Sequence, residues 1–322
     1  MTQHSKPSVA AARGPVTARD EGWCCTIAGS PLGSNCYLLP SSRGAVLIDA
    51  GHPRDERETL AAVLAQCGTD GVHTTVLTHS HADHTGAAGL LQQEAQSAIW
   101  AARSSCRARM ALHEERLKLV PRPYRVDRVV DAETGIDMDD DRLRIIPTPG
   151  HADDHVTVFL ERKRVLFCGD LFSYEDVGTL DITRSHRESL ATMLESVKLC
   201  AGLDPVEIRP GHGPVLRRPA RVFRTIEKRI SLFEANPSIL VAHTLMPLLL
   251  LLIEAHDGML LQEVCDYALS HTSYFEEFLD GLGNDMMAHQ LQKMLMILEL
   301  KGLVVVADRR VYLARNALRA AV

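Results

Sequence analysis

Four potential metal ligands occupy six consecutive positions of this chain, directly after a short apolar run. They are His79, His81, Asp83 and His84. The pattern predicts a strand over 74–78, and because residues two apart in an extended chain point the same way, His79 and His81 share one side. Asp83 and His84 then fall at the start of the next helix. Imidazole and carboxylate are ligand types that Zn²⁺ and similar divalent ions prefer, so the rest of the fold has to be arranged around a predicted metal site. A solvated polar turn is the alternative interpretation.

Three later segments each end an apolar, strand-like run in a glycine-containing turn that presents one more potential ligand. The ligands are His151 after strand 143–146, Asp170 after strand 165–168, and His212 after strand 207–209. Strand ends at one edge of a sheet meet in space, so we expect these residues to join the cluster at 79–84 in one site.

Two further residues have two interpretations each. Asp49 closes the predicted strand 45–48, and it either orients something beyond the sheet or caps the helix predicted over 55–67. His155 follows His151 by four positions, and it either lies in hydrogen-bonding contact with the site or is a satisfied histidine of the core.

The length of 322 residues exceeds the usual size of one domain, so we expect one large domain and one small one. We assign a disordered tail to 1–21, a domain with the predicted metal site to 22–235 and a helical domain to 236–322. The tail is rich in Ala, Ser, Pro and Arg and lacks the apolar core of a secretory signal. It has no acidic residue before Asp20, which is also a feature of organellar transit peptides.

The formal net charge of −6 provides no global positive field for nucleic acid or an anionic membrane. Arginines between 103 and 128 make that region basic, which suits a solvated helix face or a patch for an anionic substrate tail. Eight cysteines without a CxxC pair indicate reduced thiols in a cytoplasmic protein. The apolar run 246–253 contains a proline and is too short to cross a bilayer, so we expect a soluble protein with no membrane partner.

With these motifs in this order, the sequence resembles the metallo-β-lactamase superfamily over roughly residues 23 to 215. The motifs are Asp49-Ala50-Gly51, the cluster at 79–84, His151, Asp170 and His212. The resemblance implies an α+β fold, the αββα sandwich, in which two mixed sheets pack face to face with helices outside and metals at one edge. The hairpins predicted over 23–49 suit that architecture better than a parallel doubly wound sheet.

The metal site resembles the glyoxalase II and ribonuclease Z type, because Asp83 is present and His84 follows it. This implies two divalent metal ions, expected to be zinc, with iron or manganese as alternatives. The implied ligands are His79, His81 and His151 for one ion, Asp83, His84 and His212 for the second, and Asp170 shared between them. Asp49 would support a ligand by hydrogen bonding. Asp83 and Asp170 are the expected catalytic residues, which orient a water or carry a proton to the leaving group.

Beyond residue 236 the pattern predicts helices over 248–255, 260–269 and 286–301, followed by a hairpin over 303–313. This order resembles the winged-helix domain of the β-lactamase-like-2 group, one of whose members is described as an endoribonuclease. Residues 286–301 hold only two basic side chains, Lys293 and Lys301. We therefore expect packing against the metal domain or a homodimer contact rather than nucleic-acid binding.

We expect a dinuclear metal hydrolase that cleaves a small acyl substrate, a thioester of the hydroxyacylglutathione or acyl-CoA kind, by attack of a hydroxide that bridges the two metals. The alternative is a metal-dependent endoribonuclease in which the winged helix grips RNA. A lactonase would use the same metal site. The sequence contains neither a Gly-x-Ser-x-Gly nucleophile elbow nor a phosphate-binding loop, which argues against serine hydrolases and nucleotide-binding enzymes.

Overall fold

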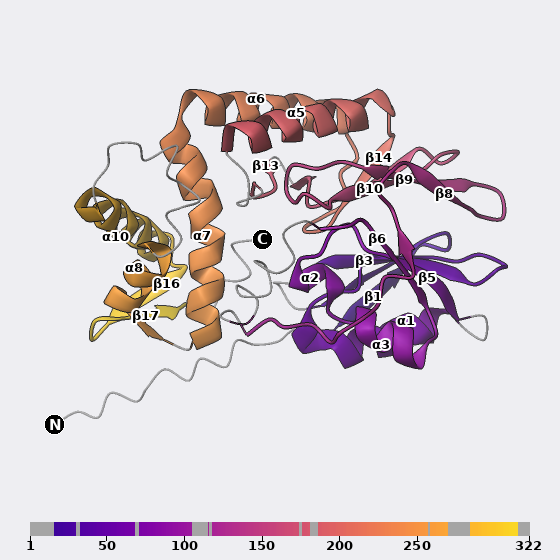
Figure 1. Ribbon diagram of the computed structural model, residues 1–322, viewed down its shortest axis with the longest axis horizontal. Coiled ribbons are helices and arrows are strands. Elements are labelled where there is room, and N and C mark those ends of the chain that lie inside the picture. The colour runs from indigo at the N-terminus through magenta and orange to yellow at the C-terminus, as the bar shows by residue number, and fades with distance from the viewer. Residues whose placement is uncertain are drawn as a thin grey trace. The chain divides into compact units, whose positions relative to one another are not determined.

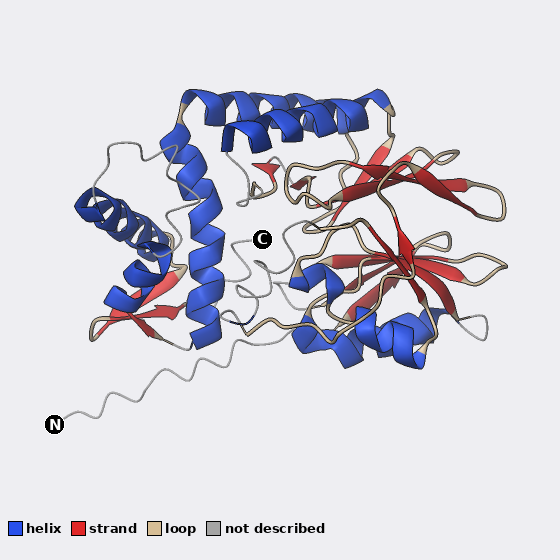
Figure 2. Ribbon diagram, viewed as in Figure 1, coloured by secondary structure: helices blue, strands red, loops and turns tan. Residues whose placement is uncertain are grey.

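The computed structural model describes residues 16–29, 33–67, 71–104, 115, 118–173, 176–180, 186–256, 258–269 and 284–314. These residues divide into two compact units, one of residues 16–240 and one from residue 241 onward. Figure 1 labels their helices and strands, and Figure 2 colours them by type.

A seven-stranded sheet forms the first half of the larger unit, in the order β1-β2-β3-β4-β5-β6-β7. Its strands are β1 (Thr17–Asp20), β2 (Cys25–Ala28), β3 (Asn35–Leu39), β4 (Ala45–Ile48), β5 (Val72–Val76), β6 (Ala98–Ala101) and β7 (Arg128–Val129). Strands β1 to β4 pair antiparallel, as the hairpins predicted over 23–49 require, whereas β4 to β7 pair parallel. The sheet is therefore mixed.

A five-stranded sheet follows, in the order β14-β11-β10-β9-β8. Its strands are β8 (Thr134–Asp137), β9 (Arg142–Pro147), β10 (Val156–Leu160), β11 (Val165–Gly169) and β14 (Glu207–Pro210). The first four pair antiparallel, and β14 joins β11 in parallel. A small ribbon of β12 (Phe172–Ser173) and β13 (Asp176–Val177) comes between β11 and β14 in the chain.

The two sheets pack face to face over an apolar core, because alternate residues of each strand point to the same face. The core draws on both sheets and includes Tyr37, Leu39, Val46, Ile48, Leu143, Ile145, Val158 and Phe167. The rings of Tyr37 and Phe167 lie 5.1 Å apart between centroids. This contact ties β3 of the first sheet to β11 of the second.

Helices cover the outer face of each sheet (Figure 2). Leu60 and Val63 of α1 (Glu56–Cys67) and Leu91 of α3 (Ala88–Glu94) share a core with the first sheet. On the second sheet, α5 (His186–Gly202) places Ser196 so that its hydroxyl donates to the carbonyl of Pro149 at 2.7 Å. Helix α6 (Pro219–Ala235) packs on α5. The order helix, sheet, sheet, helix confirms the predicted α+β sandwich.

Several elements differ from the sequence prediction. Strand β1 lies inside the segment 1–21 that we assigned to a disordered tail, because its backbone pairs with β2 over Thr17–Asp20. No helix was predicted over α5. Strand β5 ends two residues before the predicted limit of 78, and the next helix is split into α2 (Ala82–Thr85) and α3. The sequence also predicts a helix over 104–119, most of which lies outside the described residues.

A buried arginine joins the beginning of this unit to its last strand. Arg209 on β14 is fully buried, and its guanidinium pairs with the carboxylates of Glu21 and Glu207. Its Cζ also lies 4.7 Å from the ring centroid of Trp23. A guanidinium can be buried only with such partners, because an isolated charge in a dry interior is very costly.

The smaller unit contains most of α7 (Pro237–His256), then β15, two helices and a hairpin. The later elements are β15 (Met259–Leu260), α8 (Leu261–Leu269), α10 (Asn284–Leu300), β16 (Val304–Ala307) and β17 (Arg310–Leu313). The three strands form an antiparallel sheet in the order β15-β17-β16. Helix α7 begins eleven residues before the predicted start of 248 (248 − 237) and continues through Pro247, where a helix often ends.

Candidate metal centre

The structure brings all seven predicted ligands together at one edge of the sandwich. The chain reaches them from the ends of β5, β9, β11 and β14, which lead to His79, His151, Asp170 and His212. Strands β9 and β11 both run antiparallel to β10, and β14 runs parallel to β11, so these three strands end at the same edge. Residues far apart in the sequence meet there for that reason. They form two groups, and their role as ligands remains a prediction.

Three imidazole nitrogens converge in the first group. Nε2 of His151 lies 3.2 Å from Nε2 of His79 and 2.9 Å from Nδ1 of His81, and the last two atoms are 2.9 Å apart. Nitrogen ligands about 2.1 Å from a tetrahedral zinc ion would lie about 3.4 Å apart. The spacing therefore fits three ligands of one divalent ion.

Hydrogen bonds behind the rings orient two of these histidines. Nδ1 of His151 faces the carbonyl oxygen of Thr179 at 2.6 Å, and because a carbonyl only accepts, Nδ1 carries the proton. Nδ1 of His79 lies 3.1 Å from the hydroxyl of Thr78. That hydroxyl donates to the carboxylate of Asp49 at 2.9 Å and so accepts from His79. Both rings are thereby left with the Nε2 lone pair facing the first group.

The second group combines two carboxylates with two histidines. Nε2 of His212 lies 3.1 Å from Oδ2 of Asp83 and 3.4 Å from Oδ2 of Asp170. Nε2 of His84 lies 3.2 Å from Oδ1 of Asp170. Oδ2 of Asp170 is also 3.7 Å from Nε2 of His151 in the first group. Asp170 therefore lies between the two groups, as a shared ligand would.

The two groups differ in their electrostatic character. Burial lowers the pKa of His81 to about 3 and that of His79 well below its usual value. Burial also opposes protonation of His84 and His212, but the surrounding carboxylates outweigh it. Asp170 and Asp49 raise the pKa of His84 well above its usual value, and Asp170 and Asp83 raise that of His212 to about 10. The first group is neutral, whereas the second attracts cations.

Two buried polar atoms of the second group, Nε2 of His84 and Oδ1 of Asp170, face each other as an ion pair at 3.2 Å, but neither makes a hydrogen bond of good geometry to any residue that the structure describes. Buried polar atoms are nearly always satisfied in native proteins, so such a pair calls for an explanation. A divalent cation held by both atoms would satisfy them and would replace the protons that the carboxylates attract to the histidines. The donor set and its charge therefore fit a metal ion.

Asp49 and His155 lie behind the ligands. Asp49 accepts the Nδ1 proton of His84 at 2.8 Å and the backbone N–H of Thr78, also at 2.8 Å. These bonds place Asp49 beside His84, and its role in supporting a metal ligand stays a prediction. His155 is buried, and its Nδ1 donates to the carbonyl oxygen of Thr148 at 3.1 Å, while its Nε2 accepts the backbone N–H of Asp170. His155 is thus both a satisfied core histidine and a contact of the site.

Two glycines allow the ligand turns to approach one another. A Cβ atom on Gly211 would overlap Oδ1 of Asp170 and would lie 2.7 Å from Cε1 of His84. A Cβ atom on Gly169 would lie 2.6 Å from Nε2 of His155, and Gly169 also has a φ of +49°. Glycine is required at both positions because no other residue leaves the space of the Cβ atom empty, and at Gly169 also because other residues rarely adopt a positive φ.

Several contributors to the site have no motif in the sequence. Thr78 orients a histidine through its hydroxyl, and Thr148 and Thr179 do so chiefly through their backbone carbonyls. Asn35 and Tyr37 bond to the turn that carries His212. Threonines and asparagines are common on any surface, so their spacing carries no signal. Thr78 and Thr148 do lie within three residues of a predicted ligand, which is a weak indication.

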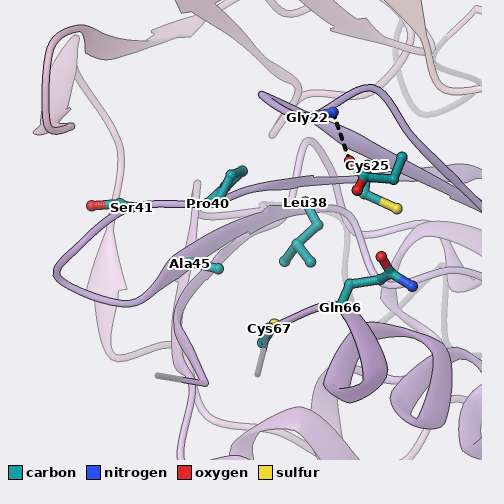
Figure 3. Close-up of a pocket in the computed structure, with 9 residues that line it drawn as sticks. Gly22, Cys25, Leu38, Pro40, Ser41, Ala45, Gln66 and Cys67 are labelled. Carbon is teal, nitrogen blue, oxygen red and sulfur yellow. Dashed lines mark hydrogen bonds between the residues drawn. The ribbon is translucent and has the colours of Figure 1, made fainter. Parts of the chain in front are cut away.

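A cavity of about 160 Å³ lies away from the metal centre (Figure 3). It is lined by Asp20, Gly22, Cys25, Leu38, Pro40, Ser41, Ala45, Gln66 and Cys67. Ser41 follows the end of β3 and Ala45 begins β4, so the cavity lies at the sheet edge opposite Asp49. Burial raises the pKa of the Cys67 thiol to about 11 and also raises that of Cys25, so neither thiol is activated.

Comparison with known protein families shows to which superfamily this chain belongs. The model of the metallo-beta-lactamase superfamily matches residues 29–212, which is more than half of the chain and includes every predicted ligand. The chain belongs to the metallo-beta-lactamase superfamily. Members of this superfamily include hydrolases, and the His and Asp groups of this chain have the donor types that metal ions require.

Curated relatives of this superfamily member match at low identity. The beta-lactamase-like protein 2 homolog of Caenorhabditis elegans is 27% identical over 207 residues, or 62% of each chain. The thioesterase pkgB of Emericella nidulans is 28% identical over 213 residues, which cover 66% of this chain and 55% of that protein. The hydroxyacylglutathione hydrolase GloC of Haemophilus influenzae is 28% identical over 185 residues, which cover 56% and 85%. The match spans less than two thirds of the first two relatives.

Solved structures share the fold over most of the chain. A beta-lactamase domain protein from Burkholderia ambifaria superposes with a TM-score of 0.59 at 16% identity, covering 96% of this chain and 98% of its own. A metallo-beta-lactamase family protein from Thermus thermophilus has a TM-score of 0.52 at 18% identity, with coverages of 93% and 97%. At these identities the similarity concerns the fold alone.

Among the helices that the structure describes, no single one has both the length and the apolar composition to cross a bilayer. The segments Pro219–Ala235 and Ser238–Ile253 meet those requirements only when they are taken together across a bend.

Proposed function

We propose that this protein is a dinuclear metal-dependent hydrolase that cleaves a small acyl substrate, specifically a thioester. The observation that carries the proposal is the position of Asp170 between two groups of ligand atoms, with Oδ1 toward His84 and Oδ2 toward His212 and His151. A carboxylate in that position could provide one oxygen atom to each of two adjacent metal ions. We propose zinc for both, since imidazole and carboxylate ligands suit it.

Divalent ions held by the two groups would lower the pKa of a bound water toward neutrality and polarise the bond to be cleaved. The protein's own residues supply orientation and proton transfer. Asp83 and Asp170 remain ionised at neutral pH, because the nearby His84 and His212 hold the pKa of both carboxyls below its usual value despite burial. Asp83 is the more exposed of the two, with 27% of its side chain accessible against 15% for Asp170. It is the better placed to accept a proton near the substrate.

The low pKa of these carboxyls supports a thioester over substrates with poorer leaving groups. A carboxyl group that is ionised at neutral pH is a weak general acid, so it does little to protonate a departing alkoxide or amine. A thiol has a pKa of about 8.5 and departs largely as the thiolate without that help. The thioesterase and hydroxyacylglutathione hydrolase names of two relatives support the same substrate class.

We propose that the smaller unit is winged-helix-like, since α7, α8 and α10 precede the hairpin of β16 and β17, and a three-stranded sheet backs them. On α10 the exposed side chains include Met296, Ile297 and Leu300. An apolar face suits protein contact, within the chain or in a homodimer, better than an RNA grip. Cytoplasmic location is likewise our proposal, supported by the free thiols of six described cysteines.

The test is thiol release from a panel of acyl-glutathione and acyl-CoA thioesters by the zinc-loaded protein. Asp170→Ala should lower kcat/KM by more than about 100-fold, because the loss of a ligand exceeds the 10–100-fold cost of losing a residue behind one. Asp140→Ala, at an exposed carboxylate paired with Arg162, is the matched control and should behave as wild type. No release by protein with two bound ions would overturn the thioesterase proposal, and RNA and lactones would then be tested.

A further inference from the structure

The turn that carries His212 has no regular structure of its own to hold it. It runs from Pro210, the last residue of β14, through Gly211 to Gly213 and Pro214. Prolines lack an N–H, and Gly213 has a φ of +81°, so few internal hydrogen bonds are available to this turn. A bridge between Ile208 and Leu216 closes the base of this loop, and the N–H of Gly211 donates to the carbonyl oxygen of Gly169 at 2.7 Å. The rest of the turn depends on a neighbouring element for its shape.

The beginning of β3 supplies four hydrogen bonds to this turn. The backbone N–H of Asn35 donates to the carbonyl oxygen of Gly211 at 2.6 Å. Its carboxamide nitrogen donates to the carbonyl oxygens of Pro210 at 3.1 Å and Gly213 at 3.0 Å. The hydroxyl of Tyr37 donates to the same Pro210 oxygen at 2.7 Å. Asn35 thus spans the turn from one side of His212 to the other.

The same segment also reaches the turn that carries Asp83. The backbone N–H of Ser34 donates to the carbonyl oxygen of Asp83 at 3.2 Å. Two ligands of the second group, Asp83 and His212, are therefore held by consecutive residues of one strand end. The first group is supported differently, since His79 and His151 bond to Thr78 and Thr179.

We propose that Asn35 and Tyr37 are positioning residues for the second metal ion and not for the first. The inference rests on the two-metal site of the proposed function. An amide suits this position because its nitrogen carries two donors, whereas a carboxylate carries none. The Nε2 of His212 must stay within bonding range of an ion that Asp83 and Asp170 also hold, and metal sites tolerate ligand displacements of only about 0.2 Å.

Asn35→Asp keeps the size of the side chain, removes both donors and sets a negative charge against two carbonyl oxygens. We expect the affinity for the second ion to fall about 10–100-fold, as when residues behind metal ligands are changed, with the first ion bound as in wild type. Tyr37→Phe should have a smaller effect in the same direction, because Asn35 still donates to the Pro210 oxygen.

The experiment is a stepwise Zn²⁺ titration of the metal-free full chain against a chromophoric chelator, with bound zinc counted after dialysis at fixed free zinc. Cobalt absorption spectra of the same variants report the environment of each ion. Asn236→Asp is the matched control, since its amide caps α6 by donating to the Leu232 carbonyl at 3.2 Å. It should leave both binding steps unchanged. Thermal unfolding in chelator establishes that each variant is folded.

A selective loss of the second step in Asn35→Asp supports the inference. Equal loss of both steps, or no change in either, overturns it while leaving the two-metal site intact. A wild-type chain that binds a single ion overturns the two-metal site and this inference together. The two failures are therefore distinguishable by the wild-type stoichiometry alone.

Discussion

The backbone N–H of Asp170 donates a hydrogen bond to Nε2 of His155 at an N···N distance of 3.2 Å. On the other side of the ring, Nδ1–H donates to the carbonyl oxygen of Thr148, which lies three residues before His151. One neutral imidazole thereby links the turns that present two predicted ligands, Asp170 and His151. Burial lowers the pKa of His155 to about 3, so this arrangement persists at all moderately acidic pH values.

The buried histidines make the metal-free protein sensitive to acid. Burial holds the pKa of His79, His81, His151 and His155 below the unfolded value of 6.5. As pH falls from 6.5 toward 4, the unfolded chain binds protons that the folded chain does not, so the free energy of unfolding decreases. Each histidine contributes up to about 1.4 kcal/mol per pH unit to that slope.

His155→Gln removes one of these groups, and its amide can still donate on one side and accept on the other. We expect a shallower slope of unfolding free energy against pH than in wild type. Urea unfolding of both metal-free proteins between pH 4.5 and 6.5 measures it. A slope equal to that of wild type would show that His155 does not stay neutral in the fold.

Thr78→Val tests how His79 is oriented. Valine has the shape of threonine but cannot accept the Nδ1 proton of His79, which lies 3.1 Å from the hydroxyl. The affinity for the first ion should therefore fall about 10–100-fold. Thr78→Ser keeps the hydroxyl and serves as the control. If zinc titration gave Thr78→Val the affinity of Thr78→Ser, the hydroxyl would have no part in positioning His79.

Gly211→Ala should prevent the second ion from binding. The added methyl group would overlap Oδ1 of Asp170 and crowd His84, and the turn cannot give way while Asn35 holds it. Gly202→Ala, at the end of α5, is the control, because a Cβ there meets no atom within 4 Å. Bound zinc per chain after dialysis is the measurement. Two ions per chain in Gly211→Ala would contradict the close approach.

The two ions should differ in the pH dependence of binding. His212, with a pKa of about 10, and His84, with a pKa well above its usual value, are protonated at pH 6–8 in the metal-free protein. The second ion must displace both protons, so its affinity should rise by up to about two orders of magnitude per pH unit. The first group is neutral, and its affinity should change little. Isothermal titration at pH 6, 7 and 8 measures the affinity for each ion. If the logarithm of both affinities rose equally with pH, His84 and His212 would not carry the protons that the second ion is expected to displace.

The sequence predicted the site best where a potential metal ligand directly follows an apolar, strand-like run. Each predicted ligand follows an apolar run, and an apolar run ending in glycine fixes both the strand and the edge at which it stops. Helix α5 was missed, although Leu190, Met193, Val197 and Cys200 recur at helical spacing and are buried. The predicted start of α7 at 248 is too late, because a proline such as Pro247 usually marks a helix boundary.

The residues that support the ligands could not be predicted in the same way. Asn35 lies 175 positions from Pro210, and this pair meets only once both sheets have formed and packed together. His151 lies 28 positions from Thr179, and this pair meets only once the segment after β13 has folded back onto the end of β9. A polar residue that donates one hydrogen bond leaves no periodic pattern in the sequence. Such contacts depend on tertiary structure, which a local reading of the chain does not contain.

The buried ion pairs of Arg209 limit how many amino-terminal residues can be removed before the larger unit is destabilised. Glu21 provides one of the two carboxylates that neutralise the guanidinium, and Trp23 provides the ring beneath it. A chain that starts after Glu21 would lose one of the two carboxylates and the charged hydrogen bond that it accepts, at a cost of about 1.5–3 kcal/mol. Truncation of the amino-terminal segment can therefore remove residues only up to a point before Glu21.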